Sequence, residues 1–214
     1  MTPSTEMNSD TTSFAIRSST YSKTSATLQP AMSVSPIRTE RLDLVPLEPD
    51  AIRHLMTGQR KEAERLLGLT VPHEFPTTEE VAGFLAIQLR RMEESPDRRE
   101  WMARLMVARP AMIIGHCGFH GPPDVIGRAE VGYTVFAPFR GHGFAKEAAR
   151  ALVEWAFAQG QREVYASVSP GNAPSLAVVR RVGFKQVGTQ DDEIDGLEFV
   201  FAIERPPQQP PQQP

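Results

Sequence analysis

Residues 137–157 have the sequence APFRGHGFAKEAARALVEWAF, in which a glycine-rich turn leads directly into an alanine-rich helical pattern. The pattern predicts a helix from about Gly143 to Gln159, ended by Gly160. A helix start leaves four backbone N–H groups without partners, and the aligned peptide dipoles add about half a positive charge there. Because glycine has no Cβ, Gly141 and Gly143 would let an anion reach this backbone. The stretch therefore predicts a phosphate site, or else a simple glycine turn.

Two basic side chains accompany these glycines, Arg140 before them and Lys146 in the first helical turn. A cation in the first turn opposes the helix dipole, so Lys146 is expected to face an anion. The stretch has no Lys-Ser/Thr pair of the P-loop kind and only two glycines of the dinucleotide fingerprint. A different phosphate ligand is therefore expected, and a nucleotide-phosphate binder is an alternative.

Strand and helix patterns alternate on both sides of this stretch, and no internal repeat is visible. The order is strand, helices, a meander of three strands, helix, strand, helix and strand. This order predicts a mixed sheet with helices on its faces, an α/β or α+β domain. Strands are expected at 41–47, 101–108, 112–121, 129–136, 163–169 and 197–205, and further helices from Asp50, at 77–95 with Thr77 or Thr78 as its cap, and at 173–184.

The composition excludes several classes of protein. A net charge of −3 and an isoelectric point near 6.0 give no basic field, so we expect neither nucleic acid nor a membrane surface as partner. The only cysteine, Cys117, cannot form an internal disulfide, which favours a reducing cytoplasm and a structural role for this thiol.

The length of 214 residues suits one domain with two tails. Residues 1–35 are rich in Ser and Thr and poor in large apolar side chains, so we expect a disordered tail. Glu6 and Asp10 argue against a transit peptide, and Met32 is a second candidate for the initiating methionine. Residues 36–205 form the predicted domain, and the Pro- and Gln-rich residues 206–214 form the other tail.

Four segments, taken in order, resemble the GNAT acetyltransferase superfamily. The segment 130–148 resembles its central motif, Gln/Arg-x-x-Gly-x-Gly/Ala, which Arg140, Gly143 and Ala145 fill. The segment NAPSLAVVRRVGF (172–184) resembles the second signature. The segments IRTERLDLVPL (37–47) and IIGHCGFHG (113–121) resemble the branch of ribosomal-protein N-terminal acetyltransferases.

The resemblance implies a mostly antiparallel central sheet whose strands at 129–136 and 163–169 splay apart around the thioester of acetyl-CoA. It also implies that backbone N–H groups from Arg140 to Lys146 hold the pyrophosphate and that the strand edge pairs with the pantetheine arm. His142 is a further candidate phosphate contact. The implied acetyl-CoA residues are Val135, Phe136, Arg140, Gly141, His142, Gly143, Phe144, Ala145, Lys146 and Asn172.

The implied reaction is direct attack of a primary amine on the thioester in a ternary complex. Glu130 is the candidate base, directly or through a water, and partial burial would raise its pKa. The alternative is a solvated strand charge. Ser175 is the candidate proton donor, because Val179 stands where many members carry a tyrosine. Asn172 could equally be only a helix cap, with Ser175 a first-turn residue. The departure at Val179 keeps a non-catalytic acyl-CoA sensor as the alternative function.

Other residues are expected to be structural or remain open. His116 and His120 would lie about 13 Å apart on a strand, too far to share one metal ion, so no metal is expected. His73, Glu74 and Phe75 lie where this fold usually builds its acceptor side. The acceptor could be a small-molecule amine or a protein N-terminus, and the sequence does not determine the oligomeric state.

Overall fold

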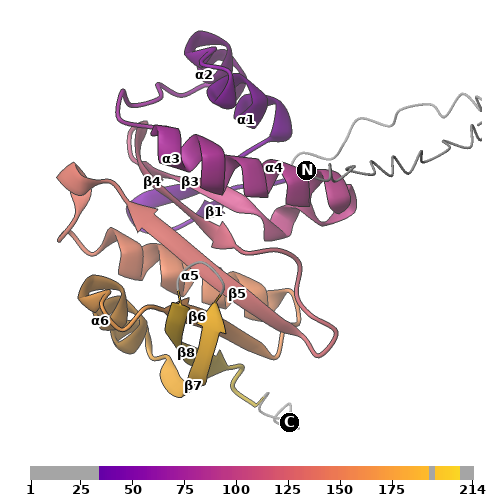
Figure 1. Ribbon diagram of the computed structural model, residues 1–214, viewed down its shortest axis with the longest axis vertical. Helices are drawn as coiled ribbons and strands as arrows, with labels where there is room; N and C mark the ends of the chain where they lie inside the picture. Colours follow the sequence, from indigo (N-terminus) through magenta and orange to yellow (C-terminus); the bar gives the residue numbers. More distant parts are fainter. Residues whose placement is uncertain (1–33, 193–195, 208–214) are drawn as a thin grey trace, which may run out of the picture. The chain divides into compact units, whose positions relative to one another are not determined.

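A computed structural model describes residues 34–192 and 196–207 of the chain (Figure 1). The predicted tails, residues 1–35 and 206–214, lie almost entirely outside these ranges, so their expected disorder stays a prediction. The described residues belong to one unit, which begins at Val34.

One mixed sheet organises this unit, with the strand order β1-β2-β3-β4-β5-β6-β8-β7. Every neighbouring pair is antiparallel except β5 and β6, which are parallel and joined through a helix (Figure 1). The mostly antiparallel mixed sheet is therefore confirmed. In the described ranges its strands are β1 (Ile37–Arg38), β2 (Leu42–Pro46), β3 (Ala103–Ala108), β4 (Met112–Phe119), β5 (Arg128–Val135), β6 (Glu163–Val168), β7 (Lys185–Asp192) and β8 (Gly196–Glu204).

Strand side chains alternate between the two faces of the sheet, so each face has apolar side chains to bury. Helices cover both faces. None of the helices in the described ranges is long and apolar enough to cross a lipid bilayer. The helices are α1 (Pro49–Met56), α2 (Arg60–Leu67), α3 (Thr78–Glu80), α4 (Ala86–Glu94), α5 (Phe144–Ala158) and α6 (Ala173–Val182); a π-helical segment, η1 (Val81–Leu85), and two short 3₁₀ turns, η2 (Pro96–Trp101) and η3 (Ala137–Phe139), complete them.

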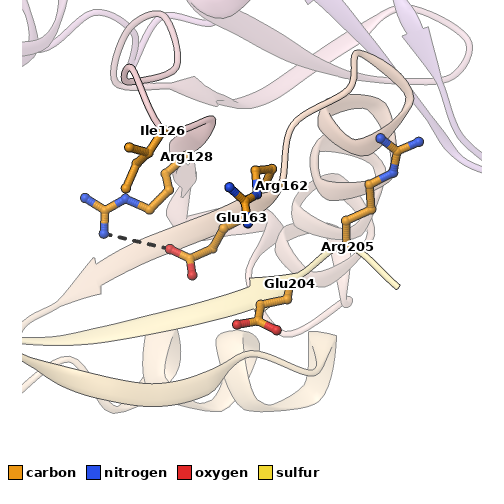
Figure 2. A pocket seen from close by; sticks show the side chains of 6 residues that line it. All are labelled: Ile126, Arg128, Arg162, Glu163, Glu204 and Arg205. Carbon is orange, nitrogen blue, oxygen red and sulfur yellow. Dashed lines mark ion pairs between the residues drawn. The ribbon is translucent and has the colours of Figure 1, made fainter. Parts of the chain in front are cut away.

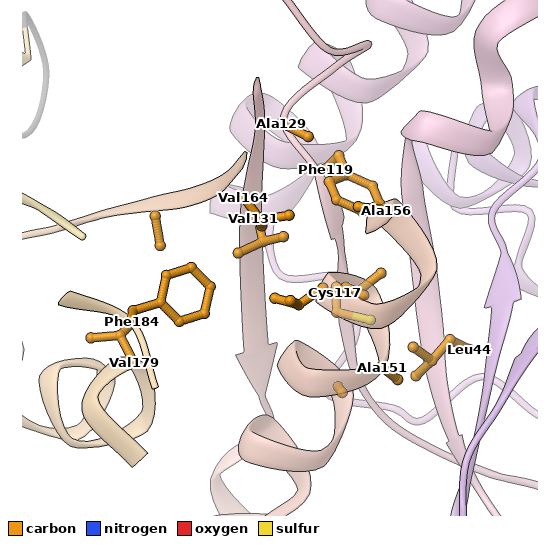
Figure 3. Close-up of a cluster of buried hydrophobic side chains, with 14 of the residues drawn as sticks. Leu44, Cys117, Phe119, Ala129, Val131, Ala151, Ala156, Val164, Val179 and Phe184 are labelled. Atoms are coloured by element: carbon orange, nitrogen blue, oxygen red, sulfur yellow. The ribbon is translucent and has the colours of Figure 1, made fainter. Parts of the chain in front are cut away.

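Two hydrophobic cores result, one on each face. The first contains α5 and α6; Figure 3 shows Ala151, Ala156 and Val179 from these helices, with Cys117 and Val131 from the strands. Cys117 is buried in this core, as expected, and burial raises the pKa of its thiol to about 12.

The second core lies under α1, α2 and α4. Leu47, Leu105 and Ile113 point to this face, whereas their sequence neighbours Met106 and Ile114 point to the first core. Buried side chains of this kind each stabilise the fold by about 1.5–3 kcal/mol relative to an exposed position.

The helix predicted at 77–95 begins as its sequence indicates. Thr77 is the cap: its side chain accepts from the Glu80 N–H at 3.1 Å, and the Glu80 carboxylate accepts from the Thr77 N–H at 2.8 Å. The chain then passes through the π-helical segment η1 before α4 continues to Glu94. Leu85 of η1 and Met92 of α4 are buried in the second core, so this segment covers the second face of the sheet.

The other predicted elements are found within a few residues of their expected limits. The strand expected at 101–108 begins at Ala103, because the 3₁₀ turn η2 occupies the residues up to Trp101. Among the described strands and α-helices, β1, α2 and β7 were not predicted separately.

Candidate functional site

The turn between β5 and α5 presents backbone donors to solvent. Gly141 and Gly143 both have φ of 81°, in the left-handed region that favours glycine. A Cβ at Gly141 would meet nothing within 4 Å. Among the described residues, the N–H groups of 141–146 have no backbone acceptor, and the first helical bond runs from Glu147 N to Gly143 O at 3.1 Å. An anion could therefore approach this row of donors, which we call the donor loop (residues 141–146).

Arg41 lies against the donor loop, a contact that sequence analysis missed. Its Nη1 donates to the carbonyl of His142 at 3.0 Å, and its guanidinium lies 4.6 Å from the ring centroid of Phe144. Its Nε donates to Glu147 Oε2 at 2.6 Å. Arg41 immediately precedes β2, so its contacts join the start of β2 to the donor loop.

The side chains around the donor loop differ in what they contact. Arg140 folds back, and its Nε donates to the carbonyl of Val135 at 2.9 Å. The Nδ1 of His142 lies 3.2 Å from the carbonyl of Phe139. Lys146 is exposed. Lys146 is thus the predicted cationic contact that faces solvent, whereas Arg140 braces the strand end.

Val135 ends β5 and Phe136 follows it, but the two residues present different backbone groups. Phe136 donates its N–H to Ile114 O and accepts from Phe139 N, both at 2.9 Å. Hydrogen-bonding direction alternates along a strand, so the backbone of Val135 points the other way, toward β6. Val135 is therefore better placed than Phe136 to pair with a ligand in that direction.

Strands β5 and β6 pair over three residues only. The register joins Arg128 to Glu163, Ala129 to Val164, and Glu130 to Tyr165. In the described ranges no pair follows, although the two strands continue to Val135 and Val168. The strands therefore separate just beyond Glu130, which agrees with the splay implied by the resemblance.

Glu130 lies where this separation begins. Its Oε1 accepts from Ser167 Oγ at 2.7 Å, and its Oε2 lies 3.4 Å from His120 Nδ1. Burial alone raises the pKa of Glu130, but contacts with His120, Ser167 and Tyr165 outweigh it and hold the pKa below its usual value. The expected rise is therefore wrong: the carboxylate is ionised at neutral pH, stabilised by these donors.

His120 is the neighbour that sequence analysis considered only as a metal ligand. Its imidazole lies over Gly132, where a Cβ would come within 2.5 Å of its Nε2. The side chain is 50 % exposed. The sequence pattern contained both residues, but nothing in their spacing signalled that the missing side chain of Gly132 makes room for the ring.

The start of α6 brings Asn172 and Ser175 together. The Asn172 side chain accepts from the Ser175 N–H at 3.1 Å, so Asn172 is the cap of α6, as one of its two interpretations required. The Tyr133 hydroxyl donates to the Ser175 carbonyl at 3.4 Å, and burial raises the pKa of Tyr133 to about 12. Val179 is buried with only 1 % exposed, so it contributes to the core.

The histidine on β4, His116, belongs to a separate cluster. His116 stacks on Phe84 with ring centroids 3.9 Å apart, and its Nε2 lies 3.4 Å from Glu80 Oε1 without hydrogen-bond geometry. Each of the two histidines thus faces its own carboxylate. In the expected acceptor region, His73 and Glu74 are exposed, whereas Phe75 is fully buried and belongs to the core.

A polar hollow of about 440 Å³ lies at the opposite end of the β5–β6 pair (Figure 2). It contains both signs of charge, and Arg128 and Glu163 pair across it at 3.9 Å. The hollow lies at the start of β5 and β6, whereas the donor loop follows the end of β5, so the hollow is not part of the candidate site. Its lining residues are Ile126, Arg128, Arg162, Glu163, Glu204 and Arg205.

Comparison with known proteins connects these features to a family. The chain is 33 % identical over 89 residues to the uncharacterized N-acetyltransferase p20 of Bacillus licheniformis; the match covers 41 % of this chain and 50 % of that protein. The chain thus spans about half the length of this curated relative.

Two solved structures share the fold. The ribosomal-protein-S5-alanine acetyltransferase from Vibrio fischeri is 17 % identical, with a TM-score of 0.58 over 82 % of this chain and 99 % of that chain. The microcin C7 self-immunity acetyltransferase MccE, solved with acetyl-CoA and AMP, is 16 % identical, with a TM-score of 0.57 over 81 % and 99 %.

The sequence profile described as acetyltransferase (GNAT) domain matches residues 41–185 of the 214-residue chain. This range contains the donor loop, the β5–β6 separation, Glu130 and Ser175. Since the match covers more than half of the chain, the protein belongs to the GNAT acetyltransferase family.

Proposed function

We propose that the protein transfers the acetyl group of acetyl-CoA to a primary amine by direct attack in a ternary complex. The observation that carries the proposal is the donor loop, which stands at the end of β5 beyond the point where β5 and β6 separate. A phosphate group at the loop and a thioester between the strands would then be parts of one extended ligand. The MccE structure, solved with acetyl-CoA, supports this ligand.

The donor loop would hold the pyrophosphate through its backbone N–H groups, including those of Phe144 and Ala145. Lys146 and His142 would add charge or hydrogen bonds at its edge, and Arg140 would brace the strand. The N–H of Val135, whose carbonyl already accepts from Arg140, would pair with the pantetheine arm. The amide of Asn172 would contact the arm while it caps α6. Phe136 is retained as a packing neighbour, because its N–H and carbonyl are engaged within the protein.

Glu130 would support the proton acceptance that an ammonium requires before it can attack. The amine nitrogen would form a bond to the thioester carbonyl carbon, the C–S bond would break, and the CoA sulfur would leave as a thiolate. Ser175 would donate a hydrogen bond or a proton to this leaving group. Buried Cys117, whose thiol pKa is about 12, is unsuited to form an acetyl-enzyme, which supports direct transfer.

The acceptor would be a small-molecule amine or a protein N-terminus. The Vibrio fischeri protein is a ribosomal-protein-S5-alanine acetyltransferase, which supports a protein N-terminus as one acceptor class. We place the reaction in the cytoplasm, the compartment that the single cysteine favours.

Calorimetry with acetyl-CoA, ATP and NAD tests the binding step. We expect acetyl-CoA to bind and the nucleotides to bind more weakly; binding of ATP or NAD without acetyl-CoA would overturn the proposal. A thiol-release assay with a monoamine, a polyamine, an amino acid and Ala- and Ser-initiated peptides then tests transfer. Acetyl-CoA binding without release across this panel would favour the sensor alternative.

Initial-velocity kinetics distinguish the two routes of transfer. Direct attack predicts that double-reciprocal lines intersect when acetyl-CoA and the best panel amine are varied together. Parallel lines would indicate an acetyl-enzyme and would contradict the ternary complex.

A further inference from the structure

An imidazole and a carboxylate face each other at the point where β5 and β6 separate. We propose that His120, through its Nε2, accepts the proton of the substrate ammonium and that Glu130 acts as the positioning residue for this imidazole. The inference rests on the proposed acetyl transfer and assigns its proton acceptor to a different residue from the strand carboxylate.

The carboxylate of Glu130 has a defined orientation. Ser167 Oγ donates to Oε1 at 2.7 Å, and Gln190 Nε2 donates to the same hydroxyl at 3.0 Å. Because Oε1 is held by this chain of hydrogen bonds from β6 and β7, Oε2 is left facing His120 Nδ1 at 3.4 Å. This contact is an ion-pair approach without hydrogen-bond geometry. A proton held on Nδ1 beside the carboxylate would leave Nε2 unprotonated and able to accept a proton.

The position of the ring favours Nε2 as the reactive atom. A Cβ on Gly132 would lie 2.5 Å from Nε2, so this atom stands directly over the backbone of Gly132. Glu130 is the last residue of β5 that pairs with β6. Gly132 is the next residue of β5 on the same face of the sheet as Glu130. Nε2 therefore lies over β5 just past the last residue that pairs with β6, beside the region where the thioester is proposed to enter.

His120, which follows the end of β4, is also accessible, unlike His116 within that strand. Its side chain is 50 % exposed, whereas that of His116 is 9 % exposed and stacks on Phe84. An incoming ammonium could reach His120 from solvent. The comparison separates the two histidines: His116 packs in the second core, and His120 faces the opening.

The charges around the pair suit this division of roles. Glu130 on β5 and Arg91 on α4 are near enough to interact electrostatically, and Tyr165 on β6 contributes a hydrogen bond. Contacts that lower the pKa of Glu130 make it a weak base at neutral pH, so its charge is better suited to stabilise an imidazolium than to take the proton itself.

The proposed step conserves atoms and charge. The ammonium passes one proton to Nε2, and the imidazolium is stabilised by the carboxylate through Nδ1–H. The free amine lone pair forms the N–C bond, and the electrons of the C–S bond leave with sulfur. The second nitrogen proton neutralises the thiolate, and His120 releases its proton to water, so each cycle yields the amide, CoA thiol and one proton.

Histidine ¹⁵N NMR on the full chain with CoA tests the pair directly. We expect the ring of His120 to be in the Nδ1–H form at pH 8 in the wild type, and to shift toward the Nε2–H form in Glu130→Gln. His54 is the matched control, since its Nδ1 contacts the neutral amide of Gln59 at 2.8 Å. An Nε2–H ring in the wild type would overturn the proposal.

Kinetics with the best panel amine provide the second arm. His120→Gln should lower kcat by about 10²-fold or more, with the KM for acetyl-CoA within about twofold, while His54→Gln should behave as wild type. Gly132→Ala, which displaces the ring, should give a similar loss without removing either group. Full activity in His120→Gln, with loss in Glu130→Gln, would return the base to Glu130 and leave the proposed function intact; an inactive wild type would instead overturn the proposed function and this inference together.

Discussion

The side chains of Arg41 and Glu147 meet at 2.6 Å although the two residues are 106 positions apart in the sequence. Glu147 Oε1 also accepts from the Arg41 N–H at 2.8 Å and from Thr39 Oγ1 at 2.6 Å. The first turn of α5 is thereby attached to the chain that enters β2. Since Arg41 also holds the carbonyl of His142, the donor loop depends on a residue far outside its own motif.

Arg41→Ala should reduce both stability and acetyl-CoA affinity. Its guanidinium is partly exposed, so the free energy of unfolding should fall by only about 1 kcal/mol. Affinity should fall several-fold, because the loop loses its support behind His142. Chemical denaturation and calorimetry measure the two effects. Arg90→Ala, which removes an exposed 3.9 Å ion pair on α4, is the control and should change neither.

Gly141→Ala should weaken acetyl-CoA binding by more than its effect on folding explains. Gly141 and Gly160 have φ of 81° and 90°, and a Cβ at either would meet nothing within 4 Å. Alanine at each should therefore cost a similar free energy, about 1–2 kcal/mol of backbone strain. Only Gly141 belongs to the donor loop, so equal affinities in Gly141→Ala and Gly160→Ala would count against phosphate binding there.

Stability should depend on Glu147 in a pH-dependent manner. Burial raises the pKa of Glu147, but bonds from Thr39 and Arg41 outweigh it and lower the pKa below 4.5. A carboxyl with a lowered folded-state pKa stabilises the protein above its unfolded pKa and loses this effect as pH falls through the folded value. The Tm difference between wild type and Glu147→Gln should thus be present at pH 7 and shrink below about pH 4.5; a constant difference would show that the charge is not responsible.

Much of the fold could be predicted because its elements carry clear patterns. The capping box at Thr77 and Glu80 and the alternating burial of β6 are local signals. In contrast, β7 is exposed at every position and pairs only with β8 among the described strands, so it has no apolar periodicity to detect. The charged helix α2 buries only Ala63, which leaves a weak pattern.

The candidate site divides in the same way. The glycines of the donor loop and the cap at Asn172 follow from backbone requirements that short motifs express. The partners of Glu130 come from the residue after β4 and from β6, so the lowered pKa depends on a sheet register that no local pattern specifies. Arg41 and His120 were missed for the same reason. Arg41 contacts His142 and Glu147, which are distant in sequence, and His120 contacts Glu130 on the neighbouring strand.

Two roles of Asn172 can be separated by substitution. Asn172→Ala should lower the free energy of unfolding by about 1 kcal/mol through loss of the helix cap. Asn172→Ser should restore most of the cap but not an amide contact with pantetheine. We therefore expect Ser to recover stability without recovering acetyl-CoA affinity, measured by denaturation and calorimetry. Full recovery of both would leave Asn172 as a cap alone.

Cys117 should be inert in the folded protein. It is buried, and burial raises the pKa of its thiol to about 12, so alkylation by iodoacetamide at pH 8 should occur only after unfolding. Mass spectrometry with increasing urea should show modification that follows the unfolding curve. Rapid modification without urea would contradict the burial. If the folded protein is not modified, Cys117 also contributes no thiol signal to the CoA-release assay.

The contact of His120 with Gly132 has an evolutionary consequence. Any side chain at 132 would displace the imidazole, so the two positions cannot vary independently while the ring keeps its place. Family members that carry a histidine at the position of His120 should retain glycine at the position of Gly132, whereas members without the histidine are free to place other residues there. The smallest residue of β5 would then mark which members can use this imidazole.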